Sequence, residues 1–80
     1  MNIEMFSKEK CSQCMEAVHR LSQQGYTVNV LKLGNDFTRE TLLSLFPNAR
    51  TYPQFRLNGQ IIGNFEALQK RLSFELEVEF

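Results

Sequence analysis

The chain has 80 residues, of which 42% are hydrophobic and 22% charged, and its nine basic side chains balance nine acidic ones. A chain of this length buries only about two-thirds of the surface that its unfolded form exposes, so we expect one small domain over residues 1–80 and no deep cofactor cavity. The zero net charge argues against nucleic-acid binding, and apolar runs far shorter than the ~20 residues of a membrane span argue against membrane insertion.

The first third of the chain predicts a strand, a helix and a second strand. Residues 2–6 alternate in polarity as a short strand does. From Cys14 onward, apolar residues recur at helical spacing as far as Gly25, so we expect a helix that opens at the cysteines. Residues 26–33 again alternate between apolar and polar side chains, which predicts a second strand. Two strands joined by a helical crossover should be parallel, with a right-handed connection.

The middle of the chain predicts a further helix and a hairpin. Thr38 is a suitable N-cap for the helix, and Pro47 ends the helical segment. Residues 54–57 and 60–62 are separated by an Asn-Gly pair, which is the strongest short sequence signal for a β-hairpin. We therefore expect two antiparallel strands that join the same sheet.

The last part of the chain predicts a helix that Asn64 can cap, followed by an unusual segment. Residues 74–80 alternate strictly between apolar and acidic side chains, which is the period of a strand. An added edge strand is the preferred interpretation, with a frayed helical end or a partner-binding tail as alternatives. The element order is thus β-α-β-α-β-β-α, an α/β fold of thioredoxin-like type with a four-stranded mixed sheet flanked by three helices.

Both cysteines of the chain lie in one tetrapeptide, Cys11-Ser12-Gln13-Cys14. A disulfide across so small a loop constrains the unfolded chain little, so reactivity explains the pair better than stability does. A Cys-x-x-Cys beside a β-α-β unit is typical of thioredoxin-like redox proteins. Half of a zinc site is the alternative, although such a site wants four ligands. Because the chain does not open like a signal peptide, a cytoplasmic location is expected.

Thiol–disulfide exchange requires a thiolate, which an ordinary cysteine with a pKa of about 8.5 supplies poorly at neutral pH. The predicted helix N-terminus places unpaired amides and the positive end of the helix dipole beside Cys11, and Lys8 and Lys10 add positive charge. These features should lower the pKa of Cys11 and make it the attacking sulfur. Cys14, one turn further along the helix, is placed to resolve the mixed disulfide.

Four blocks of the sequence together resemble the glutaredoxins, in order and at the family's spacing. They are residues 7–14, 51–55, 58–59 and 62–65. The resemblance implies a thioredoxin fold and dithiol–disulfide exchange with glutathione or protein disulfides, in a monomer that bears no metal. The pair between the cysteines, Ser-Gln, is similar to that of the glutaredoxin-like hydrogen donors of bacterial ribonucleotide reductase, which take electrons from thioredoxin reductase. Glutathione and thioredoxin reductase therefore both stand as electron donors.

The resemblance also implies a substrate groove beside the cysteines. The family's matching proline, here Pro53, is cis, and the preceding residue, Tyr52, would offer its backbone to an extended substrate. Lys8 would pair with a substrate carboxylate. The substrate-binding residues expected on this basis are Lys8, Gln13, Thr51, Tyr52, Pro53, Gly63, Asn64 and Phe65. A non-catalytic module that binds a partner in this groove is the second hypothesis.

Overall fold

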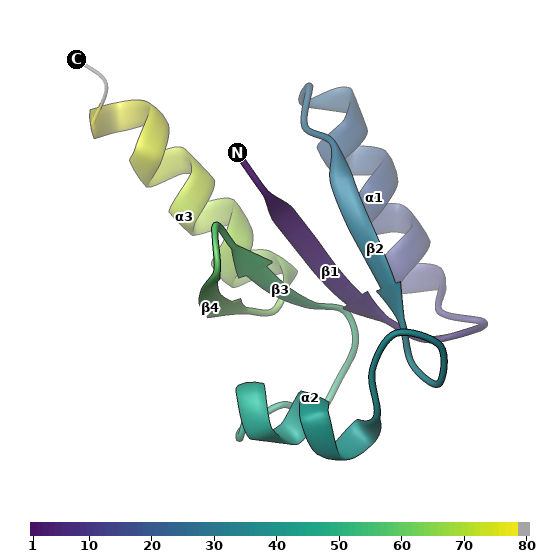
Figure 1. The fold of residues 1–80 in the computed structure, drawn as a ribbon. Coiled ribbons are helices and arrows are strands. Elements are labelled where there is room, and N and C mark those ends of the chain that lie inside the picture. The colour runs from purple at the N-terminus through teal and green to yellow at the C-terminus, as the bar shows by residue number, and fades with distance from the viewer. Residues whose placement is uncertain (79–80) are drawn as a thin grey trace.

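The computed structural model describes the backbone of residues 1–78 and the side chains of residues 1–74. Its elements are β1 (Ile3–Ser7), α1 (Ser12–Gln23), β2 (Val28–Lys32), α2 (Arg39–Leu45), β3 (Gln54–Leu57), β4 (Gln60–Gly63) and α3 (Phe65–Val78) (Figure 1). The strands form a sheet of order β2-β1-β3-β4 in which β1 and β2 are parallel and the other neighbours antiparallel. The thioredoxin-like order predicted from the sequence is confirmed.

Strand β1 lies inside the sheet and buries both of its faces. Because side chains alternate along a strand, Ile3 and Met5 face the side that α1 and α3 cover, where they share one core cluster with residues of both helices. Phe6 faces the other side and packs in a second cluster with residues of the α2 region, Phe37 and Phe46, at ring-centroid distances of 5.0 and 5.3 Å. The helices thus cover both faces of the sheet.

Local sequence signals set the ends of these elements. The Thr38 hydroxyl and the Asn64 side-chain carbonyl each accept a hydrogen bond from the backbone amide three residues further on, as N-caps do, at 3.1 and 2.9 Å. Asn58 and Gly59 both have positive φ, 52° and 82°, as the tight turn of a hairpin requires. The two caps and the hairpin predicted from the sequence are confirmed.

The expectation of an edge strand over residues 74–80 is wrong for residues 74–78, which continue α3 to Val78. Residues 79 and 80 lie outside the described part of the chain. Extending an existing helix gains one hydrogen bond for each residue fixed, and Glu and Leu are good helix formers, so the helix outcompetes a strand that would need a new partner. Over the described residues, no helix is long and apolar enough to cross a membrane.

An ion pair crosses the central strands on the α2 face. Glu4 and Arg56 lie directly opposite each other on β1 and β3, and the guanidinium donates to both carboxylate oxygens, at 2.6 and 2.9 Å. It also lies 5.2 Å from the centroid of the Phe6 ring. The hydrogen bonds from Arg56 lower the pKa of Glu4, more than partial burial raises it. This contact joins the sheet to the aromatic cluster beneath α2.

We expect Glu4→Gln to lower the free energy of unfolding at neutral pH by about 1–2 kcal/mol, because the bidentate, charge-assisted contact is lost. Since the pKa of Glu4 is lowered in the folded protein, its contribution is complete above the ordinary glutamate pKa, about 4.3, and is lost as the pH falls through the lower folded value. Urea unfolding of both proteins from neutral pH downward tests this. A stability difference that does not change with pH would contradict it.

Candidate active site

The two cysteines lie at the N-terminus of α1, just after the loop that follows β1. Lys10 adopts a left-handed conformation, φ 54°, and Cys11 is the N-cap of α1. The Cys11 sulfur accepts a hydrogen bond from the Cys14 backbone amide at 3.1 Å, and the two residues form a disulfide with their Cα atoms 5.3 Å apart. Only 8% of Cys11 and 4% of Cys14 is exposed. A sulfur atom therefore takes the capping role that a Ser or Asp oxygen usually has.

The electrostatic surroundings of the Cys11 sulfur favour a negative charge. It lies at the positive end of the dipole of α1, whose first turn holds no acidic residue. The Lys8 ammonium nearby lies 5.4 Å from the centroid of the Tyr52 ring. This contact holds a cation beside the loop that follows α2. A thiolate at Cys11 would thus have a capping amide and a cation in its vicinity.

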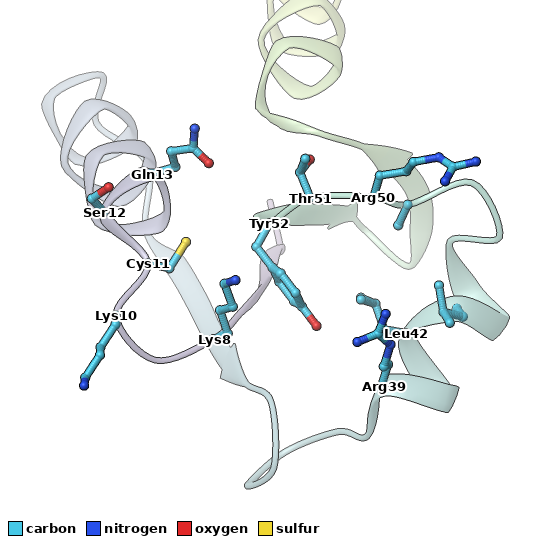
Figure 2. A pocket seen from close by; sticks show the side chains of 12 residues that line it. Lys8, Lys10, Cys11, Ser12, Gln13, Arg39, Leu42, Arg50, Thr51 and Tyr52 are labelled. Atoms are coloured by element: carbon cyan, nitrogen blue, oxygen red, sulfur yellow. The ribbon is translucent and has the colours of Figure 1, made fainter.

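A hollow of about 440 Å³ opens beside Cys11, towards α2 (Figure 2). Its cations come from three separate segments, namely Lys8 and Lys10 before α1, Arg39 at the start of α2, and Arg50 after it. Among the side chains that the structure describes, no carboxylate lines it. Figure 2 shows Lys8 and Arg39 directed towards Tyr52, whereas Lys10 points away. We call this the basic hollow, and its charge suits an anionic ligand.

A second hollow, of about 260 Å³, lies on the other side of Gln13 between α1 and the start of α3. Glu16 and Glu66 line it, and no cation among the described residues does, although each glutamate also pairs with a basic residue one turn further along its own helix. We call this the acidic hollow. The two hollows share Gln13, Thr51 and Tyr52. Hollows lined by charges of opposite sign therefore meet at Gln13, next to the cysteine pair in α1.

The predicted substrate-binding residues come together with one exception. Lys8 lines the basic hollow, and Pro53, Asn64 and Phe65 line the acidic one, with Gln13, Thr51 and Tyr52 common to both. Gly63 lines neither. Its φ of 130° is one that side chains rarely adopt, and an added Cβ would meet only Ala67, at an ordinary 3.5 Å. Backbone conformation therefore accounts for Gly63 without a contact to a ligand.

The loop at residues 51–53 is fixed by a hydrogen bond from Gln54, while the backbone groups of Tyr52 are unpaired among the described residues. The Tyr52–Pro53 peptide bond is cis, as the family resemblance implied. The side-chain amide of Gln54, a buried residue, donates a hydrogen bond to the Thr51 backbone carbonyl at 2.9 Å. In the part of the chain that the structure describes, the Tyr52 amide and carbonyl make no hydrogen bond to another residue. The backbone of Tyr52 is therefore available to a substrate.

Four charged residues that line these hollows were not assigned to the site from the sequence. Arg39, Arg50, Glu16 and Glu66 are far apart in the chain and gather only in the fold. The one sequence feature that could have indicated any of them is the position of Arg50 immediately before Thr51, a predicted substrate-binding residue. Among the described residues, no three His, Cys, Asp or Glu side chains gather as a metal site would require. The zinc alternative therefore gains no ligand beyond the cysteine pair.

Comparison with known proteins gave matches of two kinds. The model of the glutaredoxin family matches residues 3–62. Glutaredoxin 1 from Francisella tularensis, in complex with cacodylate, is 14% identical, with a TM-score of 0.72 over 95% of this chain and 96% of that one. The glutaredoxin from Brucella melitensis is 18% identical, with a TM-score of 0.68 over 99% and 85%.

The holo form of glutaredoxin C1 from Populus tremula x tremuloides is 22% identical, with a TM-score of 0.67 over 89% of this chain and 73% of that one. Comparison with curated proteins gave no match. At these identities the solved structures show a shared fold, and the family match rests on the sequence itself.

We expect the pKa of Cys11 in the reduced protein to lie well below that of an ordinary thiol, about 8.5. A hydrogen bond to a charged group contributes about 1.5–3 kcal/mol, enough to bring the pKa towards neutrality against the effect of burial. The pH dependence of iodoacetamide alkylation in Cys14→Ser measures it, because this variant keeps the capping amide. The matched control is Cys11→Ser, in which Cys14 should titrate as a buried thiol. Equal pKa values in the two variants would contradict the capping argument.

Proposed function

This chain belongs to the glutaredoxin family, and from this premise we propose that it is a dithiol–disulfide oxidoreductase in which Cys11 attacks and Cys14 resolves. The observation that carries the assignment of roles is the hydrogen bond from the Cys14 amide to the Cys11 sulfur at the N-terminus of α1. It stabilises a thiolate on Cys11 and has no counterpart for the Cys14 sulfur among the described residues. The more buried Cys14 reaches its partner from the same helix.

The proposed reaction has two exchange steps. The Cys11 thiolate attacks one sulfur of a substrate disulfide, so that a mixed disulfide forms and the other substrate sulfur leaves as a thiolate, which takes a proton from water. Cys14 then loses its proton and attacks the Cys11 sulfur. The second substrate sulfur leaves and is protonated in turn, and the Cys11–Cys14 disulfide forms. The substrate gains two electrons and two protons, and the protein is oxidised.

Glutathione is the proposed reductant that restores the dithiol. It carries two carboxylates and one ammonium group, and the basic and acidic hollows offer charges of both signs on either side of Gln13. The unpaired backbone of Tyr52 supports capture of its peptide portion in an extended form. Thioredoxin reductase is the second candidate donor, supported by the Ser12-Gln13 pair between the cysteines.

The proposed physiological substrates are protein disulfides in the cytoplasm, where dithiols of this kind are kept reduced. Ribonucleotide reductase is one such substrate, proposed from the likeness of the Ser12-Gln13 pair to that of its bacterial hydrogen donors. We further propose that the protein acts as a monomer. The alternative of a non-catalytic binding module predicts partner binding that survives removal of both sulfurs.

Cys11→Ser should abolish the reduction of hydroxyethyl disulfide and insulin, because it removes the attacking sulfur. Cys14→Ser should abolish insulin reduction but keep measurable activity on hydroxyethyl disulfide, since free glutathione can release the mixed disulfide in place of Cys14. Assays with glutathione plus glutathione reductase, and with thioredoxin reductase, distinguish the donors. Activity in Cys11→Ser equal to that of the wild type would sink the proposed function.

Neutralising the basic hollow with Lys8→Gln and Arg39→Gln together should raise the KM for glutathione by about three- to tenfold and leave kcat nearly unchanged, because charged contacts of this type contribute roughly 1 kcal/mol. The effect should shrink as salt is added. Arg71→Gln is the matched control, because Arg71 lines neither hollow. Steady-state kinetics in glutathione measure both values. An unchanged KM in the double variant would remove this hollow from the glutathione site.

A further inference from the structure

A third hollow, about 740 Å³ in volume, follows α1 on the side of β2 and ends at the cysteines. We call it the α1–β2 groove. It is lined along α1 from Cys11 to Ser22, which spans about 16 Å of helix, the length of about five residues of an extended chain. Its apolar side chains include Met15, 73% exposed, and Val30, 38% exposed. Apolar surface of this kind beside a reactive pair indicates an interaction surface.

The outer edge of β2 borders the groove and is unpaired. Strand β2 is the end strand of the sheet, bonded only to β1 among the described strands. The Leu31 carbonyl points towards β1, where it accepts from the Ser7 hydroxyl at 2.9 Å, and the Lys32 amide points outwards, to the Asp36 carboxylate at 2.8 Å. Because backbone groups alternate in direction along a strand, those of Val28 and Val30 also point outwards. They are free to pair with an added strand.

The charge of the groove restricts what can fill it. Among the described residues, the charged side chains that line it are those of Lys8, Lys10 and Lys32 and one carboxylate, that of Glu9. An acidic segment would therefore be attracted and a basic one repelled. A second copy of this chain pairing through β2 would bring the same lysines face to face, which disfavours a symmetric dimer at this edge.

We infer that the α1–β2 groove docks an extended, acidic segment of the partner protein whose disulfide is reduced. The segment adds a strand to the outer edge of β2, seats an apolar side chain between Met15 and Val30, and places carboxylates near the lysines. Lys8, Lys10 and Cys11 line the basic hollow as well, whereas Met15, Val30 and Lys32 line the groove and neither of the other two hollows. The part of the groove along β2 thus contacts the protein substrate and not glutathione. This inference rests on the proposed function only for the identity of the partner.

An NMR titration of the ¹⁵N-labelled, oxidised protein tests the docking without any redox step. The probe is the cysteine-free peptide Glu-Val-Glu-Val-Glu, and its charge-matched counterpart is Lys-Val-Lys-Val-Lys. The acidic peptide should shift the amide signals of Val28 and Val30 and bind at least about fivefold more tightly than the basic one. Equal affinities, or shifts confined to the basic hollow, would overturn the inference.

Two substitutions of Val30 test separately the contribution of its side chain and of its backbone amide to peptide binding. Val30→Glu should weaken acidic-peptide binding by at least about fivefold, because it replaces an apolar contact with a like charge. Val30→Pro should weaken it similarly, because it removes an amide that pairs with nothing in β2 or β1. Ile61→Glu is the matched control, 39% exposed on the opposite edge strand, and should bind as the wild type does. Wild-type affinity in Val30→Glu would overturn the inference even if Val30→Pro were misfolded.

Activity on hydroxyethyl disulfide separates this inference from the proposed function. If the wild type binds the acidic peptide but does not reduce hydroxyethyl disulfide, the oxidoreductase assignment fails and the docking surface stands. If it reduces hydroxyethyl disulfide but does not bind the peptide, the reverse holds. Sedimentation of the wild type and Val30→Glu adds one further outcome. A wild-type dimer that Val30→Glu dissociates would show that a second copy occupies the groove, and would overturn the inference.

Discussion

The structure depends on β1, a five-residue strand that is paired on both edges and buried on both faces. Its alternating side chains hold α1 and α3 on one face and the aromatic cluster of α2 on the other. Its last residue is followed within four residues by Cys11. Cys11 and Cys14 also belong to the core cluster that contains Ile3 and Met5. The position of the sulfurs is therefore set by the packing of the whole sheet.

This anchoring explains how a chain of 80 residues can hold a reactive site without a deep cavity. The cysteine pair is fixed by the core beneath it, and three hollows open on the surface at or near it. The hollow towards α2 is basic, the one towards α3 is acidic, and the groove towards β2 is apolar with a basic rim that shares Lys8 and Lys10 with the basic hollow.

The helix caps and the hairpin turn could be predicted from the sequence because they depend on contacts between residues close together in the chain. Thr38, Asn64 and the Asn58-Gly59 turn act through backbone atoms within three residues, so their roles are visible in the chain itself. The tail beyond Phe74 was misassigned because its alternating pattern fits a strand, while helical continuation depends on α3 already being formed. The presence of Arg39 and Arg50 in the basic hollow was not predicted, because these two residues come to lie beside Cys11 only when α2 packs against the sheet.

The proposed chemistry depends on the capping sulfur of α1 being the one that attacks. Brief reaction of Cys14→Ser and Cys11→Ser with oxidised glutathione at neutral pH, followed by intact-protein mass spectrometry, measures which sulfur forms the mixed disulfide. We expect rapid glutathionylation of Cys11 in Cys14→Ser and a rate at Cys14 lower by about tenfold or more, because Cys11 has a capping amide that favours its thiolate and Cys14 has none among the described residues. Equal rates, or faster reaction at Cys14, would contradict it.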